Sequence, residues 1–522
     1  MLRQGRAALD SGDLDAAVDA CVALGLAHYY LADVRGPLAL AADVARAELT
    51  PAQRARIVAA QARLVARLPL EIGASVALLD EDPTAPFWLP RAVESQGLAA
   101  TARALCDDAT DPLTREVVES AWRSVHRSPA FRPDAWSAVS YGDVPLSQVG
   151  DRDLDIASRV DRIMWDAVDA LEVGHRFDYD RLVREARALC ALGTMDHLHW
   201  WVQSAAVTRA MHDGQVTIAM EHADSAAVFA RGRGILGGPS VLAIQRWCLD
   251  ELRGDHAFGV EVGLTQGRRV DHPLSAVCPA LSMARSGLVP LAVPWADWAT
   301  DYLNREDQES SWLAVISICA DLASMLVEAE HPAGESLARA VSPSLERFRH
   351  RVAIDTRAVL SLGPVARAAA DLAITRGALD DAAAYVEDAE TVLQRMGRPP
   401  IPEAELAVSR ARLALARRQD PTHWVESAMG IAAGLGLGRL LDEARDIATE
   451  LDLRNSPAVL TDRERQVLRL VGEGMSNPQI ATAVAYSRAT IAKDLRRLYA
   501  KLGASDREQL MGLADDMGLL DP

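Results

Sequence analysis

Apolar residues recur at three- and four-residue spacing along nearly all of the 522 residues, which is the spacing of one face of an α-helix. The segments 182–189 and 406–415 show this pattern with polar residues between the apolar ones. Alternating β-branched runs are scarce, whereas Ala and Leu, which favour helix, are abundant. The spacing therefore predicts an all-α fold.

Composition is that of a globular protein, with 49% hydrophobic and 25% charged residues. The six cysteines lie far apart without a Cys-x-x-Cys motif, which is typical of a reducing compartment. The N-terminal residues are charged, and the apolar stretches 288–296 and 312–320 are far shorter than the roughly 18–20 residues of a membrane span. We therefore expect a cytoplasmic protein without a membrane partner.

Four glycines, each after a helical stretch and before a new helix, suggest a repeated helix–turn–helix unit. Glycine readily adopts the left-handed conformation that ends a helix. The glycines are Gly12, Gly214, Gly254 and Gly377. The pattern resembles degenerate tetratricopeptide-type repeats, in which antiparallel helix pairs stack into a solenoid. The full repeat consensus is not met, so an irregular helical domain is the alternative.

Proline-rich stretches divide the chain but are too short to be flexible linkers, so we interpret them as loops within one array. They lie at residues 83–90, 128–145, 290–294 and 399–402. The clearest boundary is the short polar break at residues 455–457. We predict a helical-repeat (tetratricopeptide-like) sensor or interaction domain over residues 1–455 and a different domain over 456–522.

Residues 460–510 carry capping signals for four short helices. Thr461 with Glu464, Ser476 with Gln479, and Ser505 with Glu508 have the spacing of a capping box, and Ser487 can cap the third helix. Gly474 and Gly503 are expected to end the first and third helices. The expected apolar faces contain Val467, Leu468, Val471, Ile480, Ala481, Val484, Ile491, Leu495, Leu498 and Leu502.

The second and third of these helices are joined by a three-residue turn, 485–487, which is typical of a helix-turn-helix. In that arrangement the third helix enters the DNA major groove. Its outward side carries Arg488, Lys493, Arg496 and Arg497, with Lys501 further along. Residues 460–510 have a net charge of +3, whereas the chain has −18. A small basic module on an acidic body is typical of a DNA-binding protein, although a solvated basic helix face is the alternative.

These motifs resemble the LuxR-type DNA-binding domain. The matching patterns are L-T-x-R-E at 460–464, V-L at 467–468, G-x-S-N at 474–477, I-A at 480–481, S-x-x-T-I at 487–491 and K-L at 501–502. The resemblance implies a fourth helix, about 505–515, that makes a dimer contact. It also implies a buried ion pair at Arg463 and Glu464.

The resemblance implies DNA contacts from the second and third helices. It places Thr490 and Ile491 at the start of the recognition helix, which meets phosphates and base edges. The predicted DNA-binding residues are Ser476, Asn477, Ser487, Arg488, Thr490, Ile491, Lys493, Asp494, Arg496, Arg497 and Lys501.

The recognition helix departs from the usual family pattern T-V-K-x-H. Here the sequence is Thr490-Ile491-Ala492-Lys493-Asp494, so the basic position is Ala and the His position is Asp. Lys493 lies one position away, rotated by about 100° around the helix. An acid facing phosphates would weaken binding or change the DNA sequence preference.

The first 455 residues are similar to the helical-repeat region of the large LuxR-type regulators, which usually begin with a P-loop ATPase. The pattern Gly-x-x-x-x-Gly-Lys-Ser/Thr is missing from this sequence. The glycine-rich stretch 232–240 lacks the lysine, and we interpret it as an interhelical loop. The resemblance is therefore to such a regulator without its ATPase.

No pattern of catalytic residues stands out, and we expect neither an enzyme nor a cofactor. The only metal-like cluster in the sequence is His197, His199, His212 and His222. Two histidines two residues apart on a helix point about 200° apart, which is poor geometry for chelation. The neighbouring Trp200 and Trp201 are expected to pack in the core or line a cleft.

Two hypotheses about function remain. In the first, the chain is a transcriptional regulator that binds double-stranded DNA as a homodimer, and its repeat domain receives a protein or small-molecule signal. In the second, it is a protein-binding repeat scaffold whose terminal module no longer binds DNA, and Asp494 is the residue that keeps this alternative open.

Overall fold

The computed structural model describes residues 1–27, 34–74, 89–107, 109–126, 153–193, 195–235, 238–265, 273–304, 311–455, 460–484, 486–516 and 519. These residues form helices and one two-stranded sheet. The first helices are α1 (Leu2–Ser11), α2 (Leu14–Leu26), α3 (Arg35–Val44), α4 (Pro51–Ala74), α5 (Leu89–Ala104) and α6 (Pro112–Val125). The middle of the chain forms α7 (Asp153–Glu172), α8 (Arg176–Cys190), α9 (Asp196–His212), α10 (Val216–Arg233), α11 (Gly238–Arg253), α12 (Ala257–Thr265), α13 (Pro273–Arg285), α14 (Val289–Asn304), α15 (Trp312–Glu328) and α16 (Pro332–Phe348).

The strands β1 (Val352–Ile354) and β2 (Ser361–Pro364) follow α16. The array then continues with α17 (Val365–Thr375), α18 (Leu379–Arg395), α19 (Pro400–Ala416), α20 (Thr422–Leu435) and α21 (Gly438–Asn455). The last helices are α22 (Asp462–Gly472), α23 (Asn477–Ala483), α24 (Arg488–Leu502) and α25 (Arg507–Asp516).

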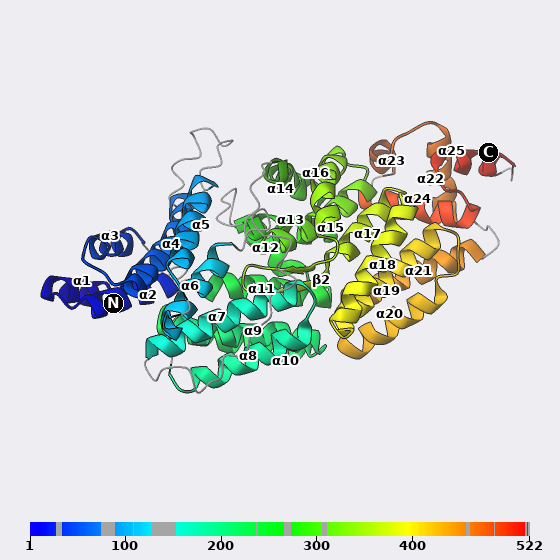
Figure 1. The fold of residues 1–522 in the computed structure, drawn as a ribbon. Helices are drawn as coiled ribbons and strands as arrows, with labels where there is room; N and C mark the ends of the chain where they lie inside the picture. The colour runs from blue at the N-terminus through cyan, green and yellow to red at the C-terminus, as the bar shows by residue number, and fades with distance from the viewer. Residues whose placement is uncertain are drawn as a thin grey trace.

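Consecutive helices pack as pairs, and neighbouring pairs lie side by side along an elongated molecule (Figure 1). Helix α7 packs on α8, α9 on α10, α15 on α16, α17 on α18 and α19 on α20. The first helices of successive pairs also contact one another, as α15 contacts α17 and α17 contacts α19. Helices α1–α3 lie at one end and α22–α25 at the other. The predicted all-α, repeat-like fold class is confirmed.

The four glycine turns predicted from the sequence connect consecutive helices. Gly12, Gly214, Gly254 and Gly377 have φ angles of 78°, 72°, 82° and 75°. A side chain at these angles would be strained, so glycine is the residue that suits each turn. Gly254 also allows close packing, because a Cβ there would lie 3.3 Å from the backbone nitrogen of Arg439 on α21.

The hairpin of β1 and β2 was not predicted from the sequence. Its strands are antiparallel, with Val352 opposite Pro364 and Ile354 opposite Ser361. The loop between them is buried, and its carbonyl groups accept hydrogen bonds from side chains of α8, α9 and α11. The donors are Tyr179 and Thr208 to Ala358, Trp201 to Arg357, and Gln245 to Val359. Tertiary contacts therefore stabilise a strand pair too short to be recognised by its own pattern.

The interpretation of the prolines as loops was wrong for residues 290–294. Both prolines lie in α14. Pro290 is in the first turn of the helix, where a backbone N–H would have no partner within the helix, so the missing N–H of proline costs no hydrogen bond. Pro294 lies inside the helix. The interpretation was also wrong for residues 400–402, which begin α19 after the cap at Pro399, and for Pro90, which lies in α5. The glycine-rich stretch at 232–240 ends α10 at Gly234 and begins α11, as expected for an interhelical connection. The stretches at 83–88 and 128–145 lie outside the described residues.

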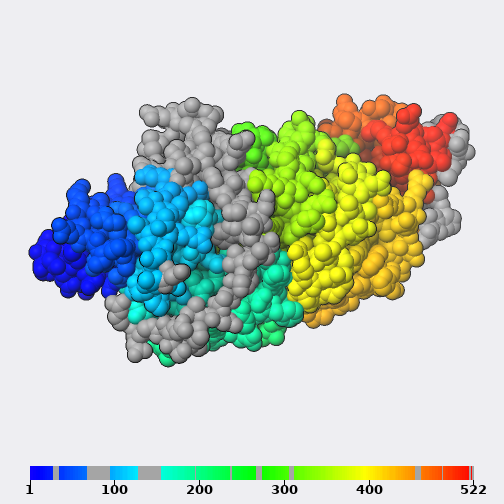
Figure 2. Space-filling view, viewed as in Figure 1, coloured from blue at the N-terminus to red at the C-terminus, as the bar shows by residue number. Residues whose placement is uncertain are grey.

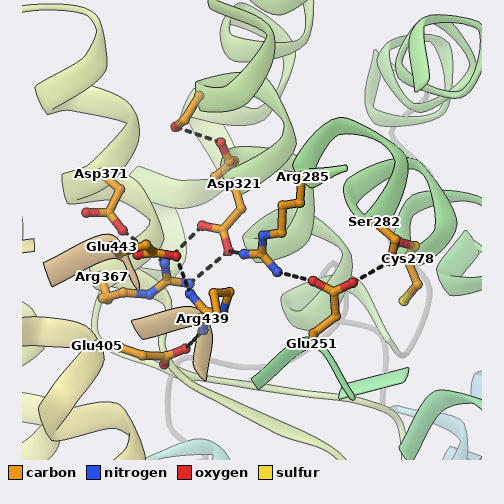
Figure 3. Close-up of polar contacts among 12 residues, drawn as sticks. Glu251, Cys278, Ser282, Arg285, Asp321, Arg367, Asp371, Glu405, Arg439 and Glu443 are labelled. Carbon is orange, nitrogen blue, oxygen red and sulfur yellow. Dashed lines mark hydrogen bonds and ion pairs between the residues drawn. The ribbon is translucent and has the colours of Figure 1, made fainter. Parts of the chain in front are cut away.

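A continuous set of buried and partly buried ion pairs ties α11, α13, α15, α17, α19 and α21 together (Figure 3). Arg439 of α21 donates to Glu405 of α19 at 2.7 Å and to Glu443 at 2.9 Å. Arg412 of α19 also donates to Glu443, at 3.0 Å. Burial opposes ionisation of Glu443, but the two guanidinium groups outweigh it and lower its pKa to about 2. Removing one partner of such an ion pair leaves the other charge without its counterion, which is costly away from water. These contacts therefore fix α21 on the array.

The set continues away from α21 through α17, α15 and α13. Its further pairs are Arg367–Asp321 at 2.9 Å, Arg367–Asp371 at 3.0 Å and Arg285–Glu251 at 2.6 Å. Beyond Glu251, the hydroxyl of Ser282 donates to that carboxylate. The charges therefore alternate through the core instead of accumulating with one sign.

The four histidines of the sequence pattern have separate environments. His197 and His212 are buried, which lowers their pKa values to about 4 and about 3, and His199 stacks on Phe229. Trp200 and Trp201 are buried in the core. Within the described ranges, three or more His, Cys, Asp or Glu side chains are nowhere grouped so as to hold a metal ion. None of the described helices is long and apolar enough to cross a membrane.

Candidate nucleic-acid interface

Helices α22–α25 enclose a small apolar core of their own. Leu468, Ile480, Ile491, Leu498 and Leu510 are fully buried in it. Each helix contributes at least one of these residues, at positions where the apolar periodicity predicts an inward side chain. This core packs α23 against α24.

Three of the four predicted helix starts are confirmed. Thr461 and Glu464 form a capping box, in which the Thr461 N–H donates to Glu464 at 2.7 Å. Ser476 and Gln479 form the box at the start of α23, and Ser487 accepts from the Thr490 N–H at 3.1 Å at the start of α24. Gly503, with φ of 71°, ends α24 as expected.

The fourth helix start differs from the predicted Ser505–Glu508 box. Asp506 accepts from the N–H of Gln509 at 2.8 Å, and the Gln509 side chain accepts from the N–H of Ser505 at 2.7 Å. Helix α25 therefore begins at Arg507. The cap is shifted by one residue, because Asp is as good a cap as Ser and the sequence offers both.

The connection between α23 and α24 is short. Helix α23 ends at Ala483, and α24 begins at Arg488. The N–H of Tyr486 donates to the carbonyl of Ala481 at 3.0 Å, which closes the turn onto the end of α23. Ala485, the first residue of the predicted turn, lies outside the described residues. This is a helix-turn-helix, with α24 as its second helix.

The structure divides the predicted DNA-binding residues by exposure. Six are exposed: Ser476, Ser487, Arg488, Lys493, Arg496 and Arg497. Thr490 and Lys501 are partly buried. Asn477, Ile491 and Asp494 are buried, with 6%, 0% and 6% of their surface exposed. Ile491 belongs to the core of the domain, so it supports the position of α24.

The sequence predicted that Asp494 would face outward toward DNA, and this prediction was wrong. Its carboxylate accepts from Arg463 of α22, at 2.9 Å from Nε and at 2.5 Å from the terminal nitrogen. The Arg463 guanidinium also lies over the Tyr486 ring, 4.0 Å from its centroid. An acid is favoured here because a guanidinium, 31 residues earlier in the chain, lies against this side of α24. The expected repulsion of phosphates therefore has no basis in the position of Asp494.

Glu464 makes the second ion pair between α22 and α24. It accepts from Lys501 at 2.7 Å, and the two side chains are 9% and 12% exposed. Burial opposes ionisation of Glu464, but the bonds from Lys501 and Thr461 outweigh it and lower the pKa of Glu464. Arg463 and Glu464 thus each bind a residue of α24 and do not bind each other. The charge of Lys501 is already neutralised by Glu464.

Two of the exposed cations contact acids of the helical array. Lys493 lies 3.3 Å from a carboxylate oxygen of Asp446 on α21. Arg496 lies 3.2 Å from a carboxylate oxygen of Glu328, the last residue of α15. Helix α24 packs directly on α21, and Figure 2 shows the C-terminal helices seated against the end of the array.

Comparison with known proteins identifies this arrangement. Residues 458–514 match the family described as bacterial regulatory proteins, luxR family. The C-terminal domain belongs to this family. This chain is 43% identical over 65 residues to the HTH-type transcriptional regulator MalT of Serratia proteamaculans. It is 39% identical over 77 residues to the probable transcriptional regulatory protein NarL of Mycobacterium tuberculosis.

Each of these similarities covers a small share of the chain. The match to MalT covers 12% of this chain and 7% of that protein, and the match to NarL covers 14% and 36%. A putative HTH-type transcriptional regulator of Mycobacterium bovis is 46% identical over 59 residues, which are 11% of this chain and 7% of that protein. No solved structure matches the chain.

Proposed function

We propose that this chain is a DNA-binding transcriptional regulator, whose helical-repeat domain (residues 1–455) controls the luxR-family domain (residues 456–522). The observation that carries the proposal is the basic surface of α24 within a domain of that family. Arg488, Lys493, Arg496 and Arg497 are all exposed on this helix. Guanidinium and ammonium groups on a recognition helix bind phosphates and the acceptor edge of guanine.

The burial of Asp494 also favours DNA binding over the scaffold hypothesis. The scaffold hypothesis depended on an acid that would repel the duplex from the recognition helix. Because the Asp494 carboxylate is bound by Arg463 inside the domain, its charge is compensated before DNA arrives. The cations of α24 then determine the electrostatics of this surface.

The array of helices α1–α21 is the part that we propose receives the signal, from a protein or a small molecule. Stacked helix pairs present extended surfaces that suit such binding. The luxR-family domain would act as a homodimer, because one helix-turn-helix reads few base pairs and two copies read paired half-sites. Such a regulator acts in the cytoplasm, and no catalytic step or cofactor is part of the proposal.

Titration of fluorescent duplex DNA with the full-length protein at several salt concentrations tests this function. Three to five phosphate contacts should give a slope of log affinity against log salt of roughly −3 to −5, at about 0.9 per phosphate. The double variant Arg488→Ala/Arg497→Ala should bind more weakly, with a slope smaller in magnitude by about 2. A flat salt response, or equal slopes for the two proteins, would support the scaffold hypothesis.

A further inference from the structure

The contact between α24 and the helical array involves groups from three separate parts of the array. Asp446 comes from α21 and Glu328 from the end of α15, and they bind Lys493 and Arg496. Arg418, which follows α19, donates to the carbonyl of Gly503 at the end of α24, at 3.0 Å. The contact therefore spans α24 from its middle to its last turn.

The two cations in this contact lie on one face of α24. Arg496 lies three positions after Lys493, so their side chains point within about 60° of each other. Their side chains are 51% and 55% exposed, and those of Asp446 and Glu328 are 70% and 39% exposed. Ion pairs with this exposure are individually weak and are screened by salt, so they can open reversibly.

Carboxylates and phosphate diesters bind ammonium and guanidinium groups in the same way, through charge-assisted hydrogen bonds to anionic oxygens. Asp446 and Glu328 therefore occupy the groups of α24 that would bind two DNA phosphates. Helix α21 itself covers this side of α24, because the two helices pack directly on each other. To bind Lys493 and Arg496, a duplex would therefore have to displace Asp446 and Glu328 from these ion pairs.

Further ion pairs tie the helix that carries Asp446 to the array. Asp446 lies three residues after Glu443, which is partly buried and accepts hydrogen bonds from both Arg439 and Arg412. Helix α21 is thus fixed to α19 by ion pairs that are costly to break. The exposed pairs to α24 are the weaker ones, so separation would occur between α21 and α24.

We propose that Asp446 and Glu328 form an intramolecular binding surface for the DNA-contacting face of α24, for which duplex DNA competes. This inference rests on the proposed function, because it assigns a regulation to the same basic surface. The net charge of −18 on residues 1–459, against zero on residues 460–522, acts in the same direction. While the two ion pairs are formed, the array both engages the cations and repels the duplex.

The first test uses the full-length double variant Glu328→Gln/Asp446→Asn, which removes both acids while keeping side-chain size. Its affinity for duplex DNA should rise by about three- to tenfold, as the loss of two exposed ion pairs implies. The matched control is Glu335→Gln/Asp442→Asn, which removes the same charge. Asp442 pairs with Arg445 on α21 itself and Glu335 with Arg376, so neither binds α24 through these pairs. Equal affinity gains in both double variants would overturn the inference.

The second test needs no DNA, because the whole chain contains only two lysines, Lys493 and Lys501. Acylation by an amine-reactive reagent, followed by mass spectrometry, reports on each separately. In Glu328→Gln/Asp446→Asn, Lys493 should be acylated at least about twofold faster, since an exposed pair has been removed. The rate at Lys501, which binds Glu464 within the domain, should stay unchanged as an internal reference.

The two tests separate failure of the inference from failure of the function. Unchanged acylation of Lys493 in the double variant would overturn the intramolecular contact, whatever the DNA result. Faster acylation without duplex binding by either protein would refute the proposed function, and with it the competition, while the contact itself would stand. Faster acylation together with tighter duplex binding is the result that we expect.

Discussion

Asp494 and Arg463 are joined by two hydrogen bonds, of 2.9 and 2.5 Å, that tie the recognition helix α24 to α22. The Asp494 side chain is 9% exposed and that of Arg463 is 39% exposed. The Asp494 carboxylate is thus bound within the domain. Its role is then to hold α24 in position, and substitutions at Asp494 should act first on the stability of the domain.

Asp494→Ala should destabilise the luxR-family domain by about 1–2 kcal/mol, because Arg463 loses a charged acceptor beside the core. Hydrogen exchange of α22 and α24 peptides, measured by mass spectrometry, should show faster exchange in both helices. Glu508→Gln, which changes an exposed acid of α25, is the control and should leave exchange unchanged. Tighter DNA binding by Asp494→Ala with unchanged exchange would show that the carboxylate acts on the duplex after all.

Arg497→Ala should weaken duplex binding by the full-length protein to a similar extent for specific and random sequences, if this side chain binds phosphate. The slope of log affinity against log salt should fall in magnitude by about 1. Arg445→Ala, which removes an exposed arginine paired with Asp442 on α21, is the control. A loss confined to the specific duplex would instead assign Arg497 to a base contact.

The protein should bind its operator as two chains, with the half-sites separated by one helical turn or a multiple of it. Helix α25, which begins at Arg507, is the predicted dimer contact. Sedimentation velocity of the complex with labelled duplex at saturating protein gives the stoichiometry directly. One chain per operator would mean that the domain recognises DNA as a monomer.

The buried His212 should make the protein sensitive to acid. Burial lowers its pKa from 6.5 to about 3, so the unfolded chain takes up a proton between these values and the folded chain does not. Stability is therefore fully present above pH 6.5 and is lost as pH falls toward 3, by about 1.4 kcal/mol per pH unit.

The variant His212→Leu should show a shallower loss of stability between about pH 6 and pH 4, by about 1 kcal/mol per pH unit. Within the described residues neither ring nitrogen of His212 has a hydrogen-bond partner, so leucine removes no such bond. Denaturant unfolding followed by circular dichroism at several pH values measures the slope. His222→Leu on α10, where the histidine is only partly buried, is the control. Equal slopes in wild type and His212→Leu would place the acid sensitivity elsewhere.

The parts of the fold that depend on neighbouring residues in the sequence could be predicted from it. The caps at Thr461, Ser476 and Ser487 and the left-handed glycine at Gly503 are local, and all four lie as expected. The start of α25 was misplaced by one residue because Asp506 competes with Ser505 as the cap.

Features that depend on distant partners could not be predicted. The β1–β2 hairpin is stabilised by side chains such as Trp201 and Gln245, more than 100 residues away in sequence. Asp494 was expected to face DNA because helical spacing alone does not reveal that Arg463 lies opposite it. Likewise, no local pattern indicates that Asp446 and Glu328 meet the basic face of α24.

Genome-wide DNA occupancy in the native host tests the central claim most directly. It should be measured for the full-length protein and for the variant Arg488→Ala/Arg497→Ala, expressed at equal levels. The account predicts discrete occupied sites, containing paired half-sites, that are lost in the variant because its recognition helix has lost two exposed cations. An absence of enriched sites for the wild-type protein, or the same sites for both proteins, would contradict it.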